Sequence, residues 1–186
     1  LGITRGEDYH LDNAAWYCSS LTCFIQSAAL PPSLVMKDML QDYFIFSKPR
    51  DIVSGDFYWI KEEKDSLVIV AADCTGHGVP GAIMSMLGIT LLNEQLAKSK
   101  LDDPGEILDT MRAKVKEMLV QQGAVEEQKD GMEMGVAIID KGKKHLQFAG
   151  ANNRLFLIRN SNKLTGKEPV WEESEVVNDD LLIDYN

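Results

Sequence analysis

The sequence has few cysteines, few basic residues and no long hydrophobic run. Its three cysteines, Cys18, Cys23 and Cys74, are an odd number without metal-ligand pairing, so we expect reduced thiols instead of disulfides or a zinc site. Lysine and arginine number 19 against 29 aspartates and glutamates, which gives a net charge of −10. This balance argues against a general nucleic-acid binder, because such a protein needs a basic surface.

The lack of a long hydrophobic run also bears on membrane attachment. The most hydrophobic long stretch, residues 82–92, is too short to span a bilayer and is interrupted by Ser85, Gly88 and Thr90. The first residues are charged and do not resemble a signal peptide. We therefore expect a soluble, cytoplasmic segment with no direct membrane insertion, which can be the output domain of a larger, membrane-attached signalling protein.

The order of apolar patterns indicates how the chain is organised. A length of 186 residues with 45% hydrophobic and 26% charged residues is typical of one soluble domain. We expect helices over residues 14–30, 79–98 and from 103 onward, the last with Asp103 as its N-cap and Pro104 at its first position. The expected strands cover residues 43–46, 57–60, 67–72, 134–139, 145–149 and 155–158, with a further strand near 170–171.

Strands come first, two helices follow, and hairpin-connected strands come last. This order predicts an α+β fold with antiparallel sheet and not alternating βα units. We divide the chain into a leader helix (residues 1–32), a core (33–160) and an acidic tail (161–186).

Two acidic turns carry the strongest chemical signal. Residues 50–59 read RDIVSGDFYW and residues 71–82 read AADCTGHGVPGA, so Asp56 and Asp73 each stand at the edge of a strand-like run beside glycine. A carboxylate at a strand end, with backbone free to approach, suits a hard divalent cation. If both aspartates face one cleft, the chain can act on phosphate through metal ions.

The glycine turn at residues 76–81 permits three interpretations. It matches the dinucleotide fingerprint G-x-G-x-x-G, but no second strand ending in an acid follows its helix. It nearly matches a phosphate loop, but Ala82 and Ile83 replace the required lysine and hydroxyl residue. The third interpretation is a metal turn, in which Asp73 offers its carboxylate and Cys74 its carbonyl oxygen. A plain helix start is equally compatible with this turn alone, and Asp56 favours the metal turn.

Four segments together resemble the metal-dependent protein phosphatase superfamily (PPM), in its bacterial SpoIIE-like branch. They are residues 46–59, 72–82, 130–134 and 148–153, and residues 25–31 resemble the junction between helix and domain. The resemblance covers residues 24–160. It implies a four-layer α/β/β/α sandwich with two antiparallel sheets, and hydrolysis of phosphoserine or phosphothreonine with two Mn²⁺ or Mg²⁺ ions.

The resemblance also implies roles for individual residues. Asp73 would bridge both metals, the Cys74 carbonyl would bind one of them, and Asp56 would be an acid of the same site. Asp130 would match the acid of a weaker third metal site.

Two neighbouring residues stay open. Arg50 could contact the substrate phosphate, or it could be a surface arginine paired with Asp51. His77 lies beside the site in a register that differs from the eukaryotic histidine, so we do not assign it as the general acid; it can equally satisfy a turn.

The resemblance ends before residues 161–186. The family adds a strand that ends in Asp-Gly and a further acid, whereas Asp179, Asp180 and Asp184 are not followed by glycine. We therefore expect an incomplete domain, in which this stretch is an acidic tail or the start of the missing part. The expected partners are a phosphoprotein, such as an anti-sigma-factor antagonist, and a second copy bound through the leader helix. The alternatives are a non-catalytic interaction module and, less favoured, a dinucleotide-binding domain.

Overall fold

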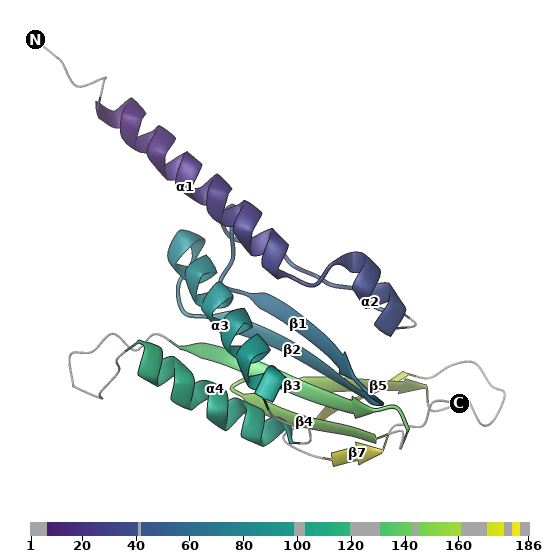
Figure 1. Cartoon of the computed structure of the whole chain (residues 1–186). Helices are drawn as coiled ribbons and strands as arrows, with labels where there is room; N and C mark the ends of the chain where they lie inside the picture. Colours follow the sequence, from purple (N-terminus) through teal and green to yellow (C-terminus); the bar gives the residue numbers. More distant parts are fainter. Residues whose placement is uncertain are drawn as a thin grey trace, which may run out of the picture.

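The structure is a computed structural model that describes residues 7–40, 42–98, 103–119, 131–142, 145–160, 171–176 and 180–182. Its helices are α1 (Glu7–Ala29), α2 (Ser33–Met39), α3 (Gly78–Lys98) and α4 (Pro104–Met118). Its strands are β1 (Phe57–Glu63), β2 (Ser66–Cys74), β3 (Met132–Asp140), β4 (His145–Ala151), β5 (Leu155–Asn160), β6 (Trp171–Val176) and β7 (Asp180–Leu182) (Figure 1).

The strands form two antiparallel sheets. The larger sheet has the order β1-β2-β3-β4-β7, and the smaller one pairs β5 with β6. Every strand pairing among the described residues is antiparallel, including that between β2 and β3, the strands before and after the two central helices. The prediction of an α+β fold with antiparallel sheets is therefore confirmed.

Helices α3 and α4 cover one face of the larger sheet (Figure 1). Alternate strand residues point to this face because side chains of a strand alternate between its two sides. Together with apolar residues of both helices they form the main core, which includes Phe57, Trp59, Val68, Val70, Met134, Val136, Leu92, Leu96, Ile107 and Met111. Met111 of α4 is buried in this core.

The opposite face of the sheet meets α2 near β1 and β2. Met36 of α2 is buried against Ile60 and Leu67, which belong to the alternate set of strand residues. The short helix α2 was not predicted from the sequence. It follows Pro31 and Pro32, at which the predicted first helix ends; the structure extends that helix at its other end to Glu7.

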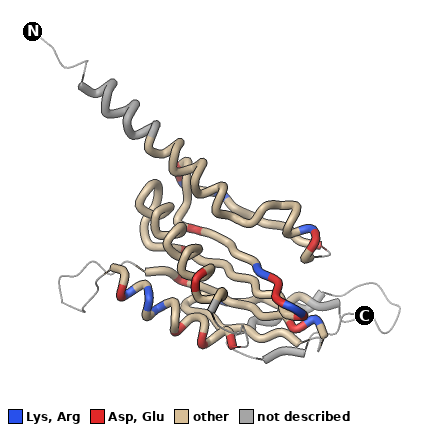
Figure 2. The backbone as a smooth tube through the Cα atoms, viewed as in Figure 1, with Lys and Arg blue, Asp and Glu red and all other residues tan. Residues whose placement is uncertain are grey.

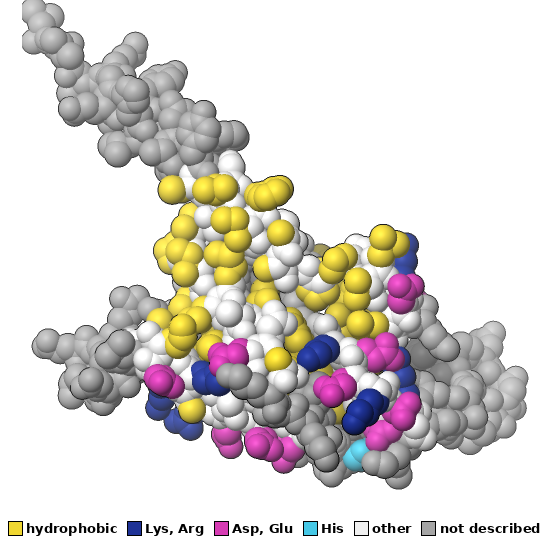
Figure 3. Space-filling view, viewed as in Figure 1, with side chains coloured by type: hydrophobic (Ala, Val, Ile, Leu, Met, Phe, Trp, Pro, Cys, Tyr) yellow, Lys and Arg dark blue, Asp and Glu magenta, His cyan; other side chains and the backbone are white. Residues whose placement is uncertain are grey.

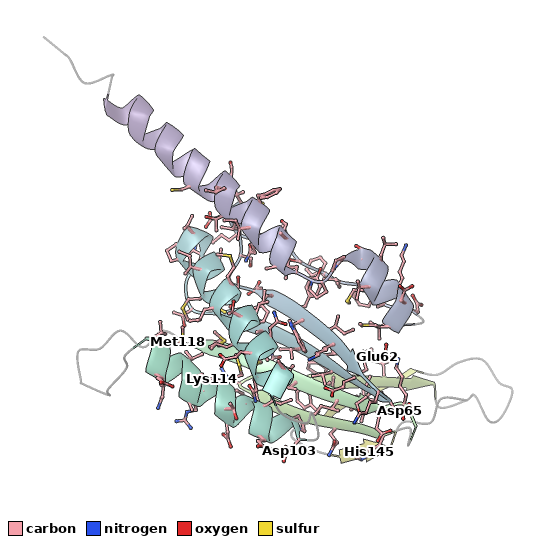
Figure 4. The ribbon with its side chains drawn as sticks, viewed as in Figure 1. Glu62, Asp65, Asp103, Lys114, Met118 and His145 are labelled. Carbon is pink, nitrogen blue, oxygen red and sulfur yellow. The ribbon has the colours of Figure 1, made fainter. Side chains whose placement is uncertain are left out.

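The start of α4 is fixed as the sequence predicts. Asp103 Oδ1 accepts hydrogen bonds from the backbone N–H groups of Gly105 at 2.7 Å and Glu106 at 3.3 Å, and Pro104 occupies the first turn. Such a cap satisfies N–H groups that have no partner within the helix. Lys114, labelled in Figure 4, extends the contact between the two central helices by an ion pair with Glu94 of α3 at 3.5 Å.

Charged residues gather at the hairpin between β1 and β2 and along α4 (Figure 2). Lys141, which follows β3, donates through Nζ to Glu62 at 2.6 Å and through its backbone N–H to the Asp65 carbonyl at 2.8 Å. These contacts tie the tips of two hairpins together at the end of the sheet far from the acidic turns.

The predicted strand at residues 43–46 is wrong. These residues form no regular structure, and Phe44 and Phe46 are 90% and 85% exposed. A run of β-favouring residues becomes a strand only where a partner strand can pair with it and bury one face. Within the described ranges, the outer edge of β1 has no such partner.

Part of the expected acidic tail, residues 161–186, forms two strands. β6 confirms the strand expected near residues 170–171, while β7 was not predicted and adds the last strand to the larger sheet by pairing with β4. Asp179 and Asp184 lie outside the described residues. The domain limits at residues 32 and 160 stay a prediction. No helix in the described part of the chain is both long and apolar enough to cross a membrane.

Candidate functional site

Four polar residues form a row across adjacent strand ends: Asp56, Asp73, Glu133 and Asn152. Phe57 pairs with Ala72, so Asp56, one residue earlier, stands opposite Asp73. Asp73 pairs directly with Glu133 across β2 and β3. Met134 pairs with Ala151, so Asn152 comes next to Glu133 at the end of β4. Since residues opposite each other share a face, the row lies on one side of the sheet.

This side is the one that α3 and α4 do not cover. Ala72, Cys74 and Met134, which alternate with the acids along the strands, are buried in the core under the helices. Asp56, Asp73 and Glu133 are exposed. The strand pattern therefore turns hydrophobic residues inward and brings three carboxylates together on an accessible surface.

The surroundings of Asp73 raise the pKa of its carboxyl group. Partial burial among the strand ends raises the pKa of its carboxyl group, although the residue keeps an exposed surface. A side-chain hydrogen bond with Asp56 and the charges of Asp56 and Glu133 raise this pKa further. Like charges held this close disfavour ionisation, and a bound cation would relieve the repulsion.

The neighbouring Cys74 side chain faces the other way, into the core. Burial raises the pKa of its thiol to about 12, and the charges of Asp73 and Asp56 act in the same direction. A thiol with this pKa stays protonated and unreactive at neutral pH. Only the backbone carbonyl of Cys74 is thus suited to a role in the site.

The two acidic turns are packed directly against each other. A Cβ atom at Gly55 would lie 2.7 Å from the carbonyl oxygen of Cys74, which is closer than real Cβ atoms approach. Glycine therefore leaves the space beside this oxygen that any side chain would fill. The close approach keeps Asp56 and Asp73 together.

A second contact joins the turns farther out. His77 Nδ1 is hydrogen-bonded to Asp51 Oδ2 at 2.9 Å, with both side chains largely exposed. Gly78 follows with a φ of 62°, which is a left-handed conformation that glycine adopts easily. Asp51 therefore joins its own turn to the one that carries His77, and the alternative that pairs it with Arg50 stays a prediction.

Further contacts hold the third and fourth strands at the site. The Thr75 N–H donates to the Gly131 carbonyl at 2.9 Å, and the Gly131 N–H donates to Thr75 Oγ1 at 3.0 Å, which extends the β2–β3 pairing past Cys74. Asn152, at a left-handed φ of 57°, donates from its side-chain amide to Glu133 Oε1. The amide thus turns one Glu133 oxygen towards β4.

The oxygen atoms at the strand ends are of the type that binds hard divalent ions, but the described residues supply few of them. Asp56 and Asp73 offer carboxylate oxygens, and Cys74 offers the backbone carbonyl oxygen on which Gly55 packs. Among the described residues, no group of three or more His, Cys, Asp or Glu side chains is arranged to hold a metal ion. The ligands available here are two carboxylates and one carbonyl, with Glu133 beside them.

The structure brings some predicted residues together and leaves others apart. Asp56, Asp73 and Cys74 converge, whereas Arg50 is exposed in the turn that carries Asp51, and Asp130 lies outside the described residues. Sequence reasoning missed Glu133 and Asn152, although both stand in motifs that it singled out. The two-residue alternation along β3, counted back from the hairpin after Asp140, would have placed Glu133 on the face of Asp73.

A cavity lies elsewhere in the described part of the chain. It has a volume of about 860 Å³ and lies between α4 and the strands β3 and β4, with Met111, Val115, Met134 and Phe148 among its lining residues. None of the three carboxylates of the row lines it. This cavity is therefore separate from the row of acids at the strand ends.

Comparison with known proteins identifies the family. The family model "Stage II sporulation protein E (SpoIIE)" matches residues 63–175, more than half of the chain. The chain belongs to the SpoIIE family. The match includes Asp73, Glu133 and Asn152, while Asp56 lies before it. A search of curated proteins gave no match.

Three solved structures are similar to this chain to different extents. The SiaA-PP2C domain of Pseudomonas aeruginosa is similar with a TM-score of 0.67 and 27% identity over 95% of this chain and 70% of that chain. The RsbU and RsbW domains of Rv1364c from Mycobacterium tuberculosis give a TM-score of 0.47 and 20% identity over 70% of this chain and 38% of that chain. A Stage II Sporulation E family protein from Thermanaerovibrio acidaminovorans gives 0.43 and 17% over 57% and 50%. The SiaA comparison confirms the PP2C-like fold.

Proposed function

We propose that this SpoIIE-family domain hydrolyses phosphoserine or phosphothreonine on a signalling phosphoprotein, with two Mn²⁺ or Mg²⁺ ions. The observation that carries the proposal is the placement of Asp56 opposite Asp73 at adjacent strand ends, with both side chains exposed on the same face of the sheet. Two carboxylates held together on an exposed surface raise the pKa of one of them, and a cation would offset that cost. The family supplies the reaction class.

In this proposal the ligands are Asp73, Asp56 and the carbonyl oxygen of Cys74, and Asp130 serves a third metal site. Divalent ions supply water acidification and charge neutralisation on the phosphoryl group when bound. The chain keeps its donors in place: Gly55 permits the close approach of the two turns, and Thr75 fixes the end of β2 against β3. Arg50 is exposed and carries a positive charge, which suits it to contact the substrate phosphate.

The proposed partners follow from the same assignment. A phosphoprotein of the anti-sigma-factor-antagonist type would present its phosphorylated residue to the open side of the sheet. A second copy would bind through α1, on which Leu21 and Phe24 are 63% and 75% exposed. Figure 3 shows hydrophobic side chains gathered where α1 meets the rest of the molecule. We propose a cytoplasmic output domain of a larger signalling protein.

A non-catalytic interaction module is the second candidate. The small ligand set among the described residues favours it, because no group of three or more metal-binding side chains is found there. This candidate predicts partner binding that survives loss of both aspartates. The dinucleotide alternative has less support, since the strand that follows the two central helices, β3, runs antiparallel to β2.

The test is hydrolysis of para-nitrophenyl phosphate and of a phosphoserine peptide by the purified chain, with Mn²⁺ and with a chelator. We expect Mn²⁺-dependent turnover that Asp73→Asn and Asp56→Asn each lower by about 100-fold or more, because even outer-shell partners of a metal cost up to that much. Lys61→Gln, at the far end of β1, should keep the activity and serves as the control. Turnover that is absent, or that persists in Asp73→Asn, would overturn the proposal.

A further inference from the structure

Gln26, near the end of α1, is a buried polar residue that the proposed chemistry does not use. Its side chain is only 7% exposed, and it lies where α1, α3 and the turn before Asp56 meet. Burying an amide is costly unless its donors and acceptor find partners. The hydrogen-bond partners of Gln26 therefore identify the segments that it connects.

Both ends of the Gln26 amide are satisfied. Nε2 donates to the Ser54 carbonyl at 2.6 Å and to Ser85 Oγ of α3 at 2.7 Å. Oε1 accepts from the Ser54 N–H at 3.3 Å. Ser85 is itself fully buried and donates to the Ala82 carbonyl at 2.9 Å, so the anchor on α3 has a fixed orientation. Gln26 thus forms hydrogen bonds with both the carbonyl and the N–H group of Ser54 in the acidic turn.

One more hydrogen bond reaches the acid itself. Ser54 Oγ accepts from the backbone N–H of Asp56 at 3.0 Å. Between the two residues lies Gly55, which is pressed against the Cys74 carbonyl. The turn is therefore held from one side by α1 through Gln26 and from the other side by the second acidic turn.

We propose that Gln26 is a positioning residue that sets the place of the Asp56 carboxylate relative to Asp73, and with it the affinity of the site for divalent ions. The inference deepens the proposed function, on which its metal-binding part rests, because it concerns the same acidic turn. Without the two Ser54 bonds, the turn keeps its packing on Cys74 and the Asp51–His77 bond but loses its tie to α1, and Asp56 samples more positions.

A matched control separates positioning from general stability. Gln95 of α3 is also a buried glutamine, 5% exposed, whose Nε2 donates to the Ile107 carbonyl of α4 at 3.4 Å. Its contact joins two helices on the covered face of the sheet and touches neither acidic turn. Methionine has a similar length and no hydrogen bonds, so Gln26→Met and Gln95→Met each remove one buried amide.

The experiment measures two quantities in the full chain: hydrogen–deuterium exchange in peptides that cover residues 52–57, and the Mn²⁺ concentration that half-saturates the thermal shift. In Gln26→Met we expect at least about tenfold faster exchange at the turn, and at least about tenfold weaker Mn²⁺ binding. In Gln95→Met both quantities should match the wild type, even where the melting temperature falls equally. Ser54→Ala, which keeps α1 untouched, should speed exchange at the Asp56 amide.

The possible results test the role of Gln26 separately from the proposed phosphatase function. Faster exchange in Gln26→Met, without any Mn²⁺ binding by the wild type, would support positioning of the turn and count against the phosphatase. Unchanged exchange and unchanged Mn²⁺ half-saturation would overturn the inference and leave Gln26 as a packing residue. If Gln26→Met does not fold, unchanged exchange at Asp56 in Ser54→Ala would overturn it.

Discussion

Asp56 stands opposite Asp73 at the ends of two paired strands, and its carboxylate acts directly on the pKa of Asp73. Two acids in this relationship repel when both are ionised, and the repulsion is part of what raises the pKa of Asp73. The repulsion therefore destabilises the fold where no cation is bound, and a cation held by both carboxylates would relieve it. The predictions that follow test both consequences and the packing that produces them.

The first prediction concerns stabilisation by metal. Mn²⁺ at 100 times its dissociation constant should stabilise the wild type by about 2.7 kcal/mol, which corresponds to about 5–10 °C in melting temperature for a domain of this size. Asp73→Asn should lose this shift, because an amide is a poorer ligand than a carboxylate. Thermal melts with and without Mn²⁺ measure the effect, and an equal shift in both proteins would contradict it.

The second prediction concerns pH in the absence of metal. An unfolded aspartate has a pKa of about 4, and the folded protein raises that of Asp73. The folded state then holds a proton that the unfolded state has already released, so this contribution is present below pH ~4 and is lost as the pH rises through the raised pKa. Asp73→Asn removes the dependence.

Melts in a chelator between pH 4 and pH 7 measure this difference. The melting temperature of Asp73→Asn should rise relative to the wild type as the pH increases. A difference that stays constant or shrinks over that range would mean that the repulsion among Asp56, Asp73 and Glu133 does not affect stability.

The third prediction concerns the cysteines. Cys74 is buried with a thiol pKa of about 12, while Cys18 of α1 is exposed. Raising a thiol pKa from about 9 to about 12 lowers its reactive thiolate about 10³-fold near pH 8. Iodoacetamide followed by mass spectrometry should label Cys18 in the folded chain and Cys74 only after denaturation. Labelling of both at similar rates would contradict the buried placement of Cys74.

The fourth prediction concerns the contact between the acidic turns. Gly55→Ala places a Cβ atom 2.7 Å from the Cys74 carbonyl oxygen and should destabilise the fold, by about 1–3 kcal/mol. Gly131→Ala is the matched control, because no atom lies within 4 Å of its added Cβ. Urea unfolding measures both free energies, and equal values would show that the close approach at Gly55 does not constrain the turns.

Local patterns sufficed for much of this fold. The two acids could be placed at strand ends because glycine-containing turns interrupt clear apolar runs, and the start of α4 could be read from Asp103 and Pro104. Residues 43–46 show the limit of such patterns. They have the β propensity of a strand, but no strand among the described residues pairs with them.

The residues that sequence reasoning missed depend on contacts between segments far apart in the sequence. Glu133 and Asn152 join the row through the β2–β3 and β3–β4 registers. Gln26 reaches Ser54 because α1 packs on α3, which no local pattern encodes. Such contacts arise from tertiary packing between segments far apart in the sequence.

The most direct test of the account is calorimetric titration of Mn²⁺ into the wild type, Asp56→Asn and Asp73→Asn, since its claim is that these two acids form one cation site. We predict saturable binding by the wild type that each single substitution weakens by about 100-fold or more, with the fold retained by circular dichroism. Binding that is absent from the folded wild type, or unchanged in either variant, would contradict the account.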